Sequence, residues 1–218
     1  MRTRAVSGLD RLWRTARTLG RRPAKGKRGA RNLPPLFLVT DPARIPDPAA
    51  AAARLPRGAG VIYRALGRPD ALEVGMRLAR TARRRGLVLL VGADEALAAA
   101  IGADGLHLPE RALHRAPRVR ARRPRWLVTG AAHGARALAR GRALDALLLS
   151  PVFESRSPSA GRPLGPVRFA ALVRRADVAV YALGGIKADA ARRLLASGAA
   201  GLAAVDGLNE VGRGPQQA

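Results

Sequence analysis

The sequence predicts a compact α/β protein of the (β/α)8 TIM-barrel class, preceded by a basic N-terminal extension. Eight short apolar runs recur between Leu36 and Val205, and segments with helical periodicity separate most of them. The runs are four to six residues long and mostly lack polar alternation, which is typical of strands buried on both faces of a parallel sheet. An open doubly wound sheet usually has fewer strands. No G-x-G-x-x-G turn follows the first run, and the chain contains no G-x-x-x-x-G-K-[ST] loop.

The expected strands follow one another at short intervals. They are LFLVT (36–40), GVIYR (60–64), GLVLLV (86–91), GLHL (105–108), WLVTG (126–130), ALLLS (146–150), VAVYAL (178–183) and GLAAV (201–205). Helices are expected at 70–85, 93–102, 134–142, 167–176 and 187–198, and several of these segments end on glycine, as helices do before a short turn. In such a barrel, ligands bind to the loops that follow the strands, and phosphate usually binds after the last two.

Composition divides the chain into three parts. We expect residues 1–35 to form a basic, flexible extension, residues 36–210 the barrel, and residues 211–218 a flexible tail. The 218 residues suffice for one sizeable core, and the absence of cysteine excludes disulfides and thiolate metal sites. No apolar run approaches the roughly 18 residues of a membrane span, and the arginine-rich start lacks the apolar stretch of a secretory signal. The sequence therefore predicts a cytoplasmic protein without a membrane span.

The net charge of +25 raises the question of a nucleic-acid partner. Nearly all basic residues are arginines, and they occur beside abundant alanine and glycine, a bias that the base composition of a genome can produce. We therefore expect no specific nucleic-acid partner. Residues 5–18 could form an amphipathic helix on an anionic surface, because apolar residues fall at helical spacing; the alternative is a mobile, solvated tail. The apolar residues are Val6, Leu9, Trp13 and Ala16.

The loops after the last three expected strands have the features of a phosphate site. The segment SPVFESRSPSAGRPLG (150–165) combines hydroxyl groups, guanidinium groups and permissive backbone, which suit a phosphate better than an apolar ligand. After the seventh strand, Gly184 and Gly185 let backbone N–H groups approach oxygen atoms at the start of a helix, whose N-terminus favours an anion. The simpler interpretation is that these glycines only allow a tight turn. The eighth strand reaches the same region at Val205 and Asp206.

Four separated segments resemble the thiamine phosphate synthase/TenI family in order and spacing: LFLVTDP, IGADGLHLPE, SPVFESRSPSAGRPLG and ALGGIKADAARRLLASGAAGLAAV. The resemblance covers about residues 36–208 and implies a (β/α)8 barrel of thiamine biosynthesis. Synthases of this family are transferases that join hydroxymethylpyrimidine pyrophosphate to thiazole phosphate, forming thiamine phosphate, with Mg²⁺ on the pyrophosphate. TenI-like relatives are isomerases that tautomerise a thiazole carboxylate phosphate without a metal.

The resemblance also implies roles for individual residues. Arg64 matches an arginine that contacts pyrophosphate, and His133 matches a histidine that transfers protons in the tautomerases. The alternative for His133 is a helix-cap or packing role, and His107 is expected to be structural. Arg156 could replace a family lysine, because a guanidinium group binds phosphate well. The remaining phosphate-binding residues would be Ser155, Ser157, Gly184, Gly185, Val205 and Asp206.

The metal-binding positions of the family are changed in this chain. The two aspartates that hold Mg²⁺ correspond to Ala93 and Ala112. The nearby Asp94 and Glu110 could rebuild the site, or could serve at helix N-termini, where acidic side chains complement the helix dipole. Three functions stay open: a synthase, a metal-free tautomerase with His133 as acid and base, and a non-catalytic binder of phosphorylated ligands whose basic tail binds a polyanion.

Overall fold

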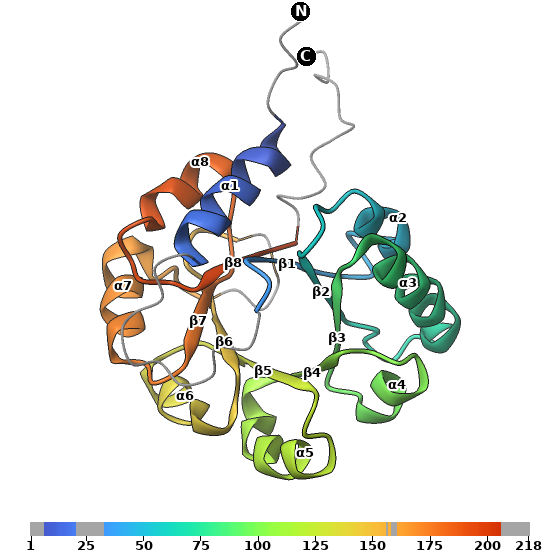
Figure 1. Ribbon diagram of the computed structural model, residues 1–218. Helices are drawn as coiled ribbons and strands as arrows, with labels where there is room; N and C mark the ends of the chain where they lie inside the picture. The colour runs from blue at the N-terminus through green and yellow to red at the C-terminus, as the bar shows by residue number, and fades with distance from the viewer. Residues whose placement is uncertain (1–6, 21–32, 156, 158–160, 206–218) are drawn as a thin grey trace, which may run out of the picture.

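The computed structural model describes residues 7–20, 33–155, 157 and 161–205. Its strands form a closed, parallel barrel in the order β1 to β8, with the helices around the outside (Figure 1). The strands are β1 (Leu36–Val39), β2 (Gly60–Tyr63), β3 (Val88–Gly92), β4 (Gly105–Leu108), β5 (Leu127–Ala132), β6 (Ala146–Leu149), β7 (Ala179–Ala182) and β8 (Gly201–Ala204). All eight predicted strands are present, so the predicted (β/α)8 barrel is confirmed.

The helices include every helix predicted within the barrel. They also include α2 and α5, which the sequence did not predict, and α1, for which the sequence offered a helix only as an alternative to a mobile tail. The α-helices are α1 (Gly8–Gly20), α2 (Pro48–Ala53), α3 (Ala71–Arg85), α4 (Glu95–Ala100), α5 (Ala116–Arg122), α6 (Ala135–Ala139), α7 (Gly165–Arg175) and α8 (Ala188–Ala191). Short 3-10 helices are η1 (Glu110–Arg115), η2 (Gly141–Ala143) and η3 (Arg192–Leu194). Among the described residues, no helix has the length and apolar character that crossing a membrane requires.

Two aromatic rings fill the interior of the barrel near the amino ends of the strands. Phe37 and Tyr181 meet edge to face with their ring centroids 5.2 Å apart, and the Tyr181 hydroxyl donates to the Pro34 carbonyl at 2.7 Å. A Cβ atom at Gly60 would lie 2.3 Å from the Phe37 ring, and one at Gly201 would lie 2.6 Å from the Tyr181 ring. Glycine at these two positions therefore makes room for the rings, and this half of the barrel is a packed core.

Two aspartates that precede strands connect neighbouring strands at the amino end of the barrel. Asp104, just before β4, accepts a hydrogen bond from the Leu89 amide of β3 at 2.8 Å. Asp145, just before β6, accepts from the Val128 amide of β5 and from Arg120, both at 2.8 Å. The Asp145 side chain is only 2% exposed. Its negative charge is therefore compensated inside the protein rather than by water.

The prediction of a flexible extension is wrong for residues 8–20, which form helix α1. Leu12, Ala16 and Leu19 are buried, and the helix packs against α8, β8 and β1 (Figure 1). Its first turn is capped by Ser7, whose hydroxyl accepts from the amide of Asp10 at 3.1 Å. The apolar face that could have covered an anionic surface is thus buried within this chain.

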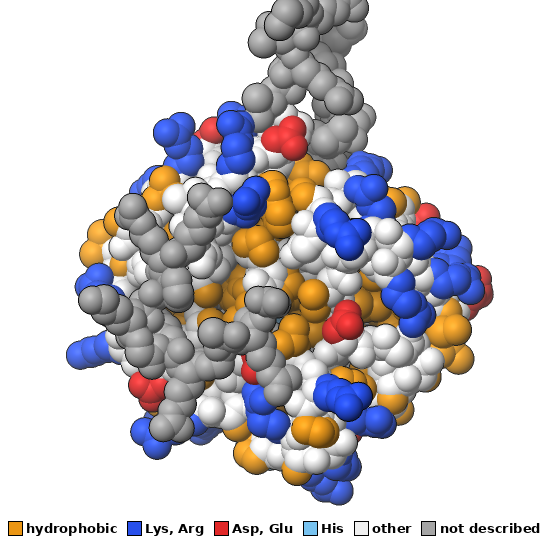
Figure 2. Space-filling model, in the orientation of Figure 1, with side chains coloured by type: hydrophobic (Ala, Val, Ile, Leu, Met, Phe, Trp, Pro, Cys, Tyr) orange, Lys and Arg blue, Asp and Glu red, His pale blue; other side chains and the backbone are white. Residues whose placement is uncertain are grey.

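The remaining parts of the predicted extension and tail, residues 1–6, 21–32 and 211–218, lie outside the described residues, and the domain boundaries stay a prediction. The basic side chains are not confined to the N-terminal segment. On the face shown in Figure 2, Lys and Arg occur around the circumference of the barrel and hydrophobic side chains lie nearer its centre. On this face, the described basic side chains do not form the single stripe or patch that is typical of a nucleic-acid footprint.

Candidate active site

A cavity of about 1400 Å³ lies at the carboxyl ends of the strands. It is lined by every predicted ligand-binding residue that the structure describes, although these residues follow five different strands. They are Arg64, His133, Ser155, Ser157, Gly184, Gly185 and Val205. Arg156 and Asp206, also predicted to bind ligand, lie outside the described residues. The structure therefore brings the predicted residues together, and their ligand-binding roles stay predictions.

The turn after β7 requires glycine at two successive positions. Gly184 and Gly185 have φ angles of 92° and 65°, in the left-handed region that side chains other than glycine rarely adopt. A Cβ atom at Gly184 would lie 2.8 Å from Cα of Pro151, and one at Gly185 would lie 2.3 Å from the carbonyl oxygen of Glu154. The β6–α7 loop therefore lies directly against this turn, and any side chain would force the two apart.

Hydrogen bonds attach the same loop to the carbonyl groups of the turn. The Val152 amide donates to the Leu183 carbonyl at 2.9 Å, and the Phe153 amide donates to the Gly184 carbonyl at 3.0 Å. Among the described residues, none accepts a hydrogen bond from the amides of Gly184 or Gly185. The loop thus occupies carbonyls of the turn and leaves its amides available, at a cavity that the end of β8 also lines through Val205.

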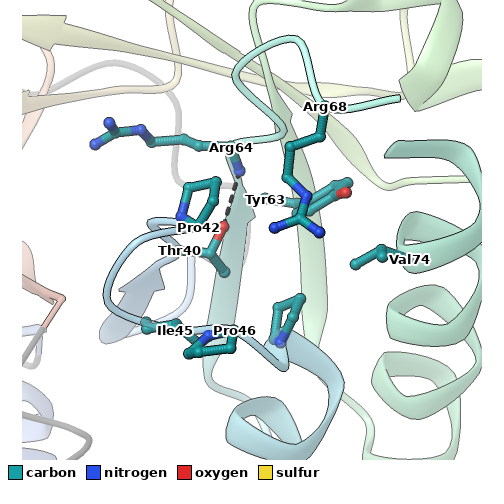
Figure 3. A pocket seen from close by; sticks show the side chains of 9 residues that line it. Thr40, Pro42, Ile45, Pro46, Tyr63, Arg64, Arg68 and Val74 are labelled. Atoms are coloured by element: carbon teal, nitrogen blue, oxygen red, sulfur yellow. Dashed lines mark hydrogen bonds between the residues drawn. The ribbon is translucent and has the colours of Figure 1, made fainter. Parts of the chain in front are cut away.

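On another side of the cavity, Asp41 holds two arginines. Arg64 follows β2, and its backbone amide donates to the Thr40 hydroxyl at 2.9 Å, while its side chain points away from Arg68 (Figure 3). The Asp41 carboxylate accepts from Arg44 at 3.0 Å and lies 3.8 Å from Nη2 of Arg64. Burial raises the pKa of Asp41, but the Arg44 hydrogen bond and the charges of both arginines outweigh burial and lower the pKa overall.

His107 lies at the base of the cavity, where the sequence predicted only a structural role. Its Nδ1 atom lies 2.9 Å from the Thr129 hydroxyl, and the residue is 9% exposed. Burial, and secondarily the charge of Arg64, lowers the pKa of His107 to about 4, so the ring is neutral at pH 7. The alternation of β4 gave a signal for this position: His107 follows Gly105 at the strand's two-residue period, on the face that points into the barrel.

His133 and Glu110 form a pair at the cavity edge. The Glu110 carboxylate lies 2.6 Å from Nδ1 of His133 and accepts a hydrogen bond from its backbone amide at 2.8 Å. Because an ionised carboxylate only accepts hydrogen bonds, Nδ1 carries the proton in this contact and Nε2 is left as the basic atom. A half-exposed imidazole oriented by a carboxylate in this way suits proton transfer.

Comparison with known proteins assigns the family. The sequence model of the family described as thiamine monophosphate synthase (TMP-TENI) matches residues 36–208. The chain belongs to this family. Its match agrees with the resemblance found in the four sequence segments, and the matched region contains all eight strands.

Known relatives in the thiamine monophosphate synthase family share about a third of the aligned residues with this chain. The chain is 34% identical over 143 residues to the thiamine biosynthesis bifunctional protein ThiM/ThiE of Symbiobacterium thermophilum, across 64% of this chain and 30% of the relative. It is also 34% identical over 142 residues to the putative thiamine-phosphate synthase of Geobacter sulfurreducens, across 63% of this chain and 66% of the relative. These matches thus span less than two thirds of either relative's length.

Solved structures confirm the fold. Thiamine phosphate pyrophosphorylase from Pyrococcus furiosus superposes with a TM-score of 0.65 at 21% identity, over 80% of this chain and 86% of that chain. FabK from Thermotoga maritima superposes with a TM-score of 0.59 at 14% identity, over 81% of this chain and 59% of that chain. At such identities the likeness is one of barrel architecture.

The carboxylates near the cavity do not fit the Mg²⁺ site that the family resemblance implies. Ala93 and Ala112 offer no ligand atom at the two positions concerned. Asp94 caps helix α4, accepting from the Leu97 amide at 2.8 Å, and Glu110 is engaged with His133. Within the described parts of the chain, no three His, Asp or Glu side chains gather as a metal site would require. Asp94 and Glu110, as they lie here, therefore do not fit such a site, and whether the protein uses Mg²⁺ stays a prediction.

Cations outnumber anions on the cavity wall. The acidic residues on the wall include Glu95, which lies 2.5 Å from Arg122 and 3.9 Å from Arg115 and is therefore already paired. The wall thus favours an anionic ligand. The basic residues that line the cavity are Arg44, Arg64, Arg111, Arg115 and Lys187, and the acidic ones are Asp94, Glu95 and Glu154.

Proposed function

We propose that this protein binds thiazole phosphate and condenses it with hydroxymethylpyrimidine pyrophosphate to form thiamine phosphate. The observation that carries this proposal is the shared cavity of the Gly184–Gly185 turn, Val205 and Arg64 at the carboxyl end of the barrel. Membership in the thiamine monophosphate synthase family and the excess of cations on the wall support it. The amides of the glycine turn, which have no acceptor among the described residues, would bind the phosphate of the thiazole.

The barrel geometry suits two substrates with anionic ends. In a closed barrel of eight strands, β3 lies across from β7, so the loops after β2 to β4 face the glycine turn across the barrel mouth. The phosphate of the thiazole would bind on the β7–β8 side, and the pyrophosphate near Arg64 on the opposite side. Both heteroaromatic rings would then lie between them, above His107 and Thr129.

The condensation breaks one covalent bond and forms another. The bond between the pyrimidine methylene carbon and the pyrophosphate oxygen breaks, and the electron pair leaves with the pyrophosphate. The lone pair of the thiazole nitrogen then forms the new carbon–nitrogen bond. No proton has to move, so the protein contributes by holding both substrates in position and by stabilising charge on the leaving oxygens.

The test is to incubate the full-length chain with both substrates and to follow thiamine phosphate and pyrophosphate together. Equal formation of the two products is expected. Calorimetric titration with thiazole phosphate measures the affinity of the protein for this substrate. Gly185→Val should weaken that binding at least about a hundredfold, because the side chain displaces the loop and hinders access to the amides. Gly161→Val is the matched control, because a Cβ atom at Gly161 meets open space. If neither product forms, the condensation is refuted. If thiazole phosphate does not bind, the proposed function as a whole is refuted.

A second function, metal-free tautomerisation of a thiazole carboxylate phosphate, is favoured by one observation, the contact between Glu110 and His133. In this reaction Nε2 of His133 would remove a proton from one ring position and return it to another. His133→Ala should abolish tautomerisation and leave the affinity for thiazole phosphate nearly unchanged. Glu110→Gln should lower the rate less, because it disturbs only the orientation of the ring. Tautomerisation that survives in His133→Ala would exclude this role.

A further inference from the structure

Near the end of β3, the cavity wall carries alanine at a position where the family resemblance implies an acidic metal ligand, and arginines follow the two neighbouring strands. Resting on the proposed function, we propose that the guanidinium groups of Arg64 and Arg111, rather than a divalent metal ion, neutralise the pyrophosphate group. The site would thus take a metal-free diphosphate. The inference starts from the carboxylates described above, which are either replaced by alanine or engaged in other contacts.

The strand order places the two arginines on either side of the lost carboxylate. Strand β3 pairs with β2 on one side and with β4 on the other. Arg64 directly follows β2, Arg111 follows β4 within η1, and Ala93 directly follows β3. All three residues line the cavity. The position that carries a metal-binding aspartate in the family is therefore flanked by guanidinium groups, which bind phosphate oxygens directly.

Arg64 is held in this arrangement from two directions. Its side chain passes over Gly92, where an added Cβ atom would lie 3.2 Å from Cγ of Arg64. Glycine at this position thus leaves room for the arginine stem. Asp41 lies 3.8 Å from Nη2 of Arg64, a distance that orients the guanidinium group without occupying its donors through a short hydrogen bond. Arg64 therefore keeps donors for a ligand.

Arg111 has no hydrogen-bond or ion-pair partner among the described residues, although it lines the cavity and is exposed. Its neighbour Ala112 is the other position that carries a metal-binding aspartate in the family. A divalent cation between Arg64 and Arg111 would be repelled by both and attracted by no carboxylate at Ala93 or Ala112. A diphosphate in the same place would be attracted by both arginines.

Calorimetric titration of the full-length chain with inorganic pyrophosphate tests the inference. Binding in EDTA should be as tight as binding with Mg²⁺. Arg111→Gln should weaken binding in EDTA about tenfold or more, because one charge-assisted contact is lost. The matched control is Arg118→Gln on α5, which removes the same charge from an exposed position outside the cavity and should have little effect. An equal loss in both variants would mean general attraction to a basic protein and would overturn the proposal.

A second pair of variants isolates charge at the end of β3. Ala93→Asp and Ala93→Asn introduce side chains of the same size, and both residue types tolerate the left-handed backbone found at Ala93. The Asp variant should bind pyrophosphate in EDTA about tenfold more weakly than the Asn variant, because its carboxylate competes for Arg64 and Arg111. Equal affinities of the two variants would contradict the proposal.

The outcomes separate this inference from the proposed function. Pyrophosphate binding that requires Mg²⁺, or no pyrophosphate binding in either buffer, overturns the metal-free site. The binding of thiazole phosphate to the glycine turn is measured separately and can persist in both cases. If thiazole phosphate fails to bind while pyrophosphate binds in EDTA, the proposed function fails and the anion site at Arg64 and Arg111 remains.

Discussion

The two ends of this barrel differ in whether their polar groups have hydrogen-bond partners and in whether their backbone is strained. At the amino end, the Asp145 carboxylate and the Tyr181 hydroxyl both have hydrogen-bond partners. At the carboxyl end, Arg111 and the amides of Gly184 and Gly185 have no partner among the described residues, and Leu66 and Ala93 have positive φ angles. The comparison indicates that paired polar groups stabilise the amino end, while unpaired donors and strained backbone lie at the carboxyl end, where barrel enzymes bind their ligands.

The largest expected effect on stability is at Asp145. Asp145→Ala removes the acceptor of the buried Val128 amide and of Nη2 of Arg120, which keeps only its Nε contact with the Ala143 carbonyl, so we expect the free energy of unfolding to fall by about 3–5 kcal/mol. Urea denaturation measures this change. Asp177→Ala is the control, because Asp177 is an exposed partner of Arg142 at 3.7 Å and surface ion pairs contribute roughly 0–1 kcal/mol. Similar losses in the two variants would refute the distinction between the ends.

Helix α1 extends the stabilising region to the N-terminal segment. Leu12 is fully buried against the barrel, so Leu12→Ala should lower the free energy of unfolding by about 2–5 kcal/mol through lost burial and a cavity. The exposed Leu72 on α3 provides a control of the same chemistry, and Leu72→Ala should cost much less. If Leu12→Ala leaves the unfolding midpoint unchanged, α1 contributes nothing to the stability of the barrel.

His107 should make stability depend on pH. The folded protein holds the pKa of His107 near 4, below the ordinary value of 6.5, because the neutral ring is buried. The unfolded chain therefore binds more protons than the folded one between these values, and stability falls as the pH decreases from about 6.5 to 4. The loss from this group should reach about 3 kcal/mol at the acid end. In His107→Gln this part of the pH dependence should disappear; an unchanged acid profile would contradict the buried neutral state.

The strands could be predicted from the sequence because burial on both faces leaves a local signal. Each run from Leu36 to Val205 is short and apolar, and a closed parallel barrel is the arrangement that buries all of them. Helix α2 gave no such signal, because its PAAAAA sequence has no apolar periodicity. Helix α5 gave no signal because it is mostly polar: arginines surround its two buried residues, Ala116 and Val119, and hide the apolar spacing.

The candidate site could be predicted only in part. The local sequence shows which residues follow each strand, so Arg64, Gly184 and Gly185 could be assigned to the carboxyl end of the barrel. The contacts of Glu110 with His133 and of His107 with Thr129 join residues 23 and 22 positions apart, and no local pattern indicates them. The burial of α1 also depends on distant partners, since its apolar face could equally have covered an anionic surface.

The smallest expected effect concerns the strained backbone at the carboxyl end. Ala93 has a φ angle of 65°, which costs residues other than glycine roughly 1–2 kcal/mol. Ala93→Gly relieves this strain and loses some chain entropy, so we expect a net gain of up to about 1 kcal/mol in urea denaturation. Ala99→Gly in the exposed, helical part of α4 should instead lower stability by about 1 kcal/mol. A gain in stability for Ala93→Gly together with a loss for Ala99→Gly would show that the backbone at Ala93 is strained. A loss of stability in both variants would contradict this strain.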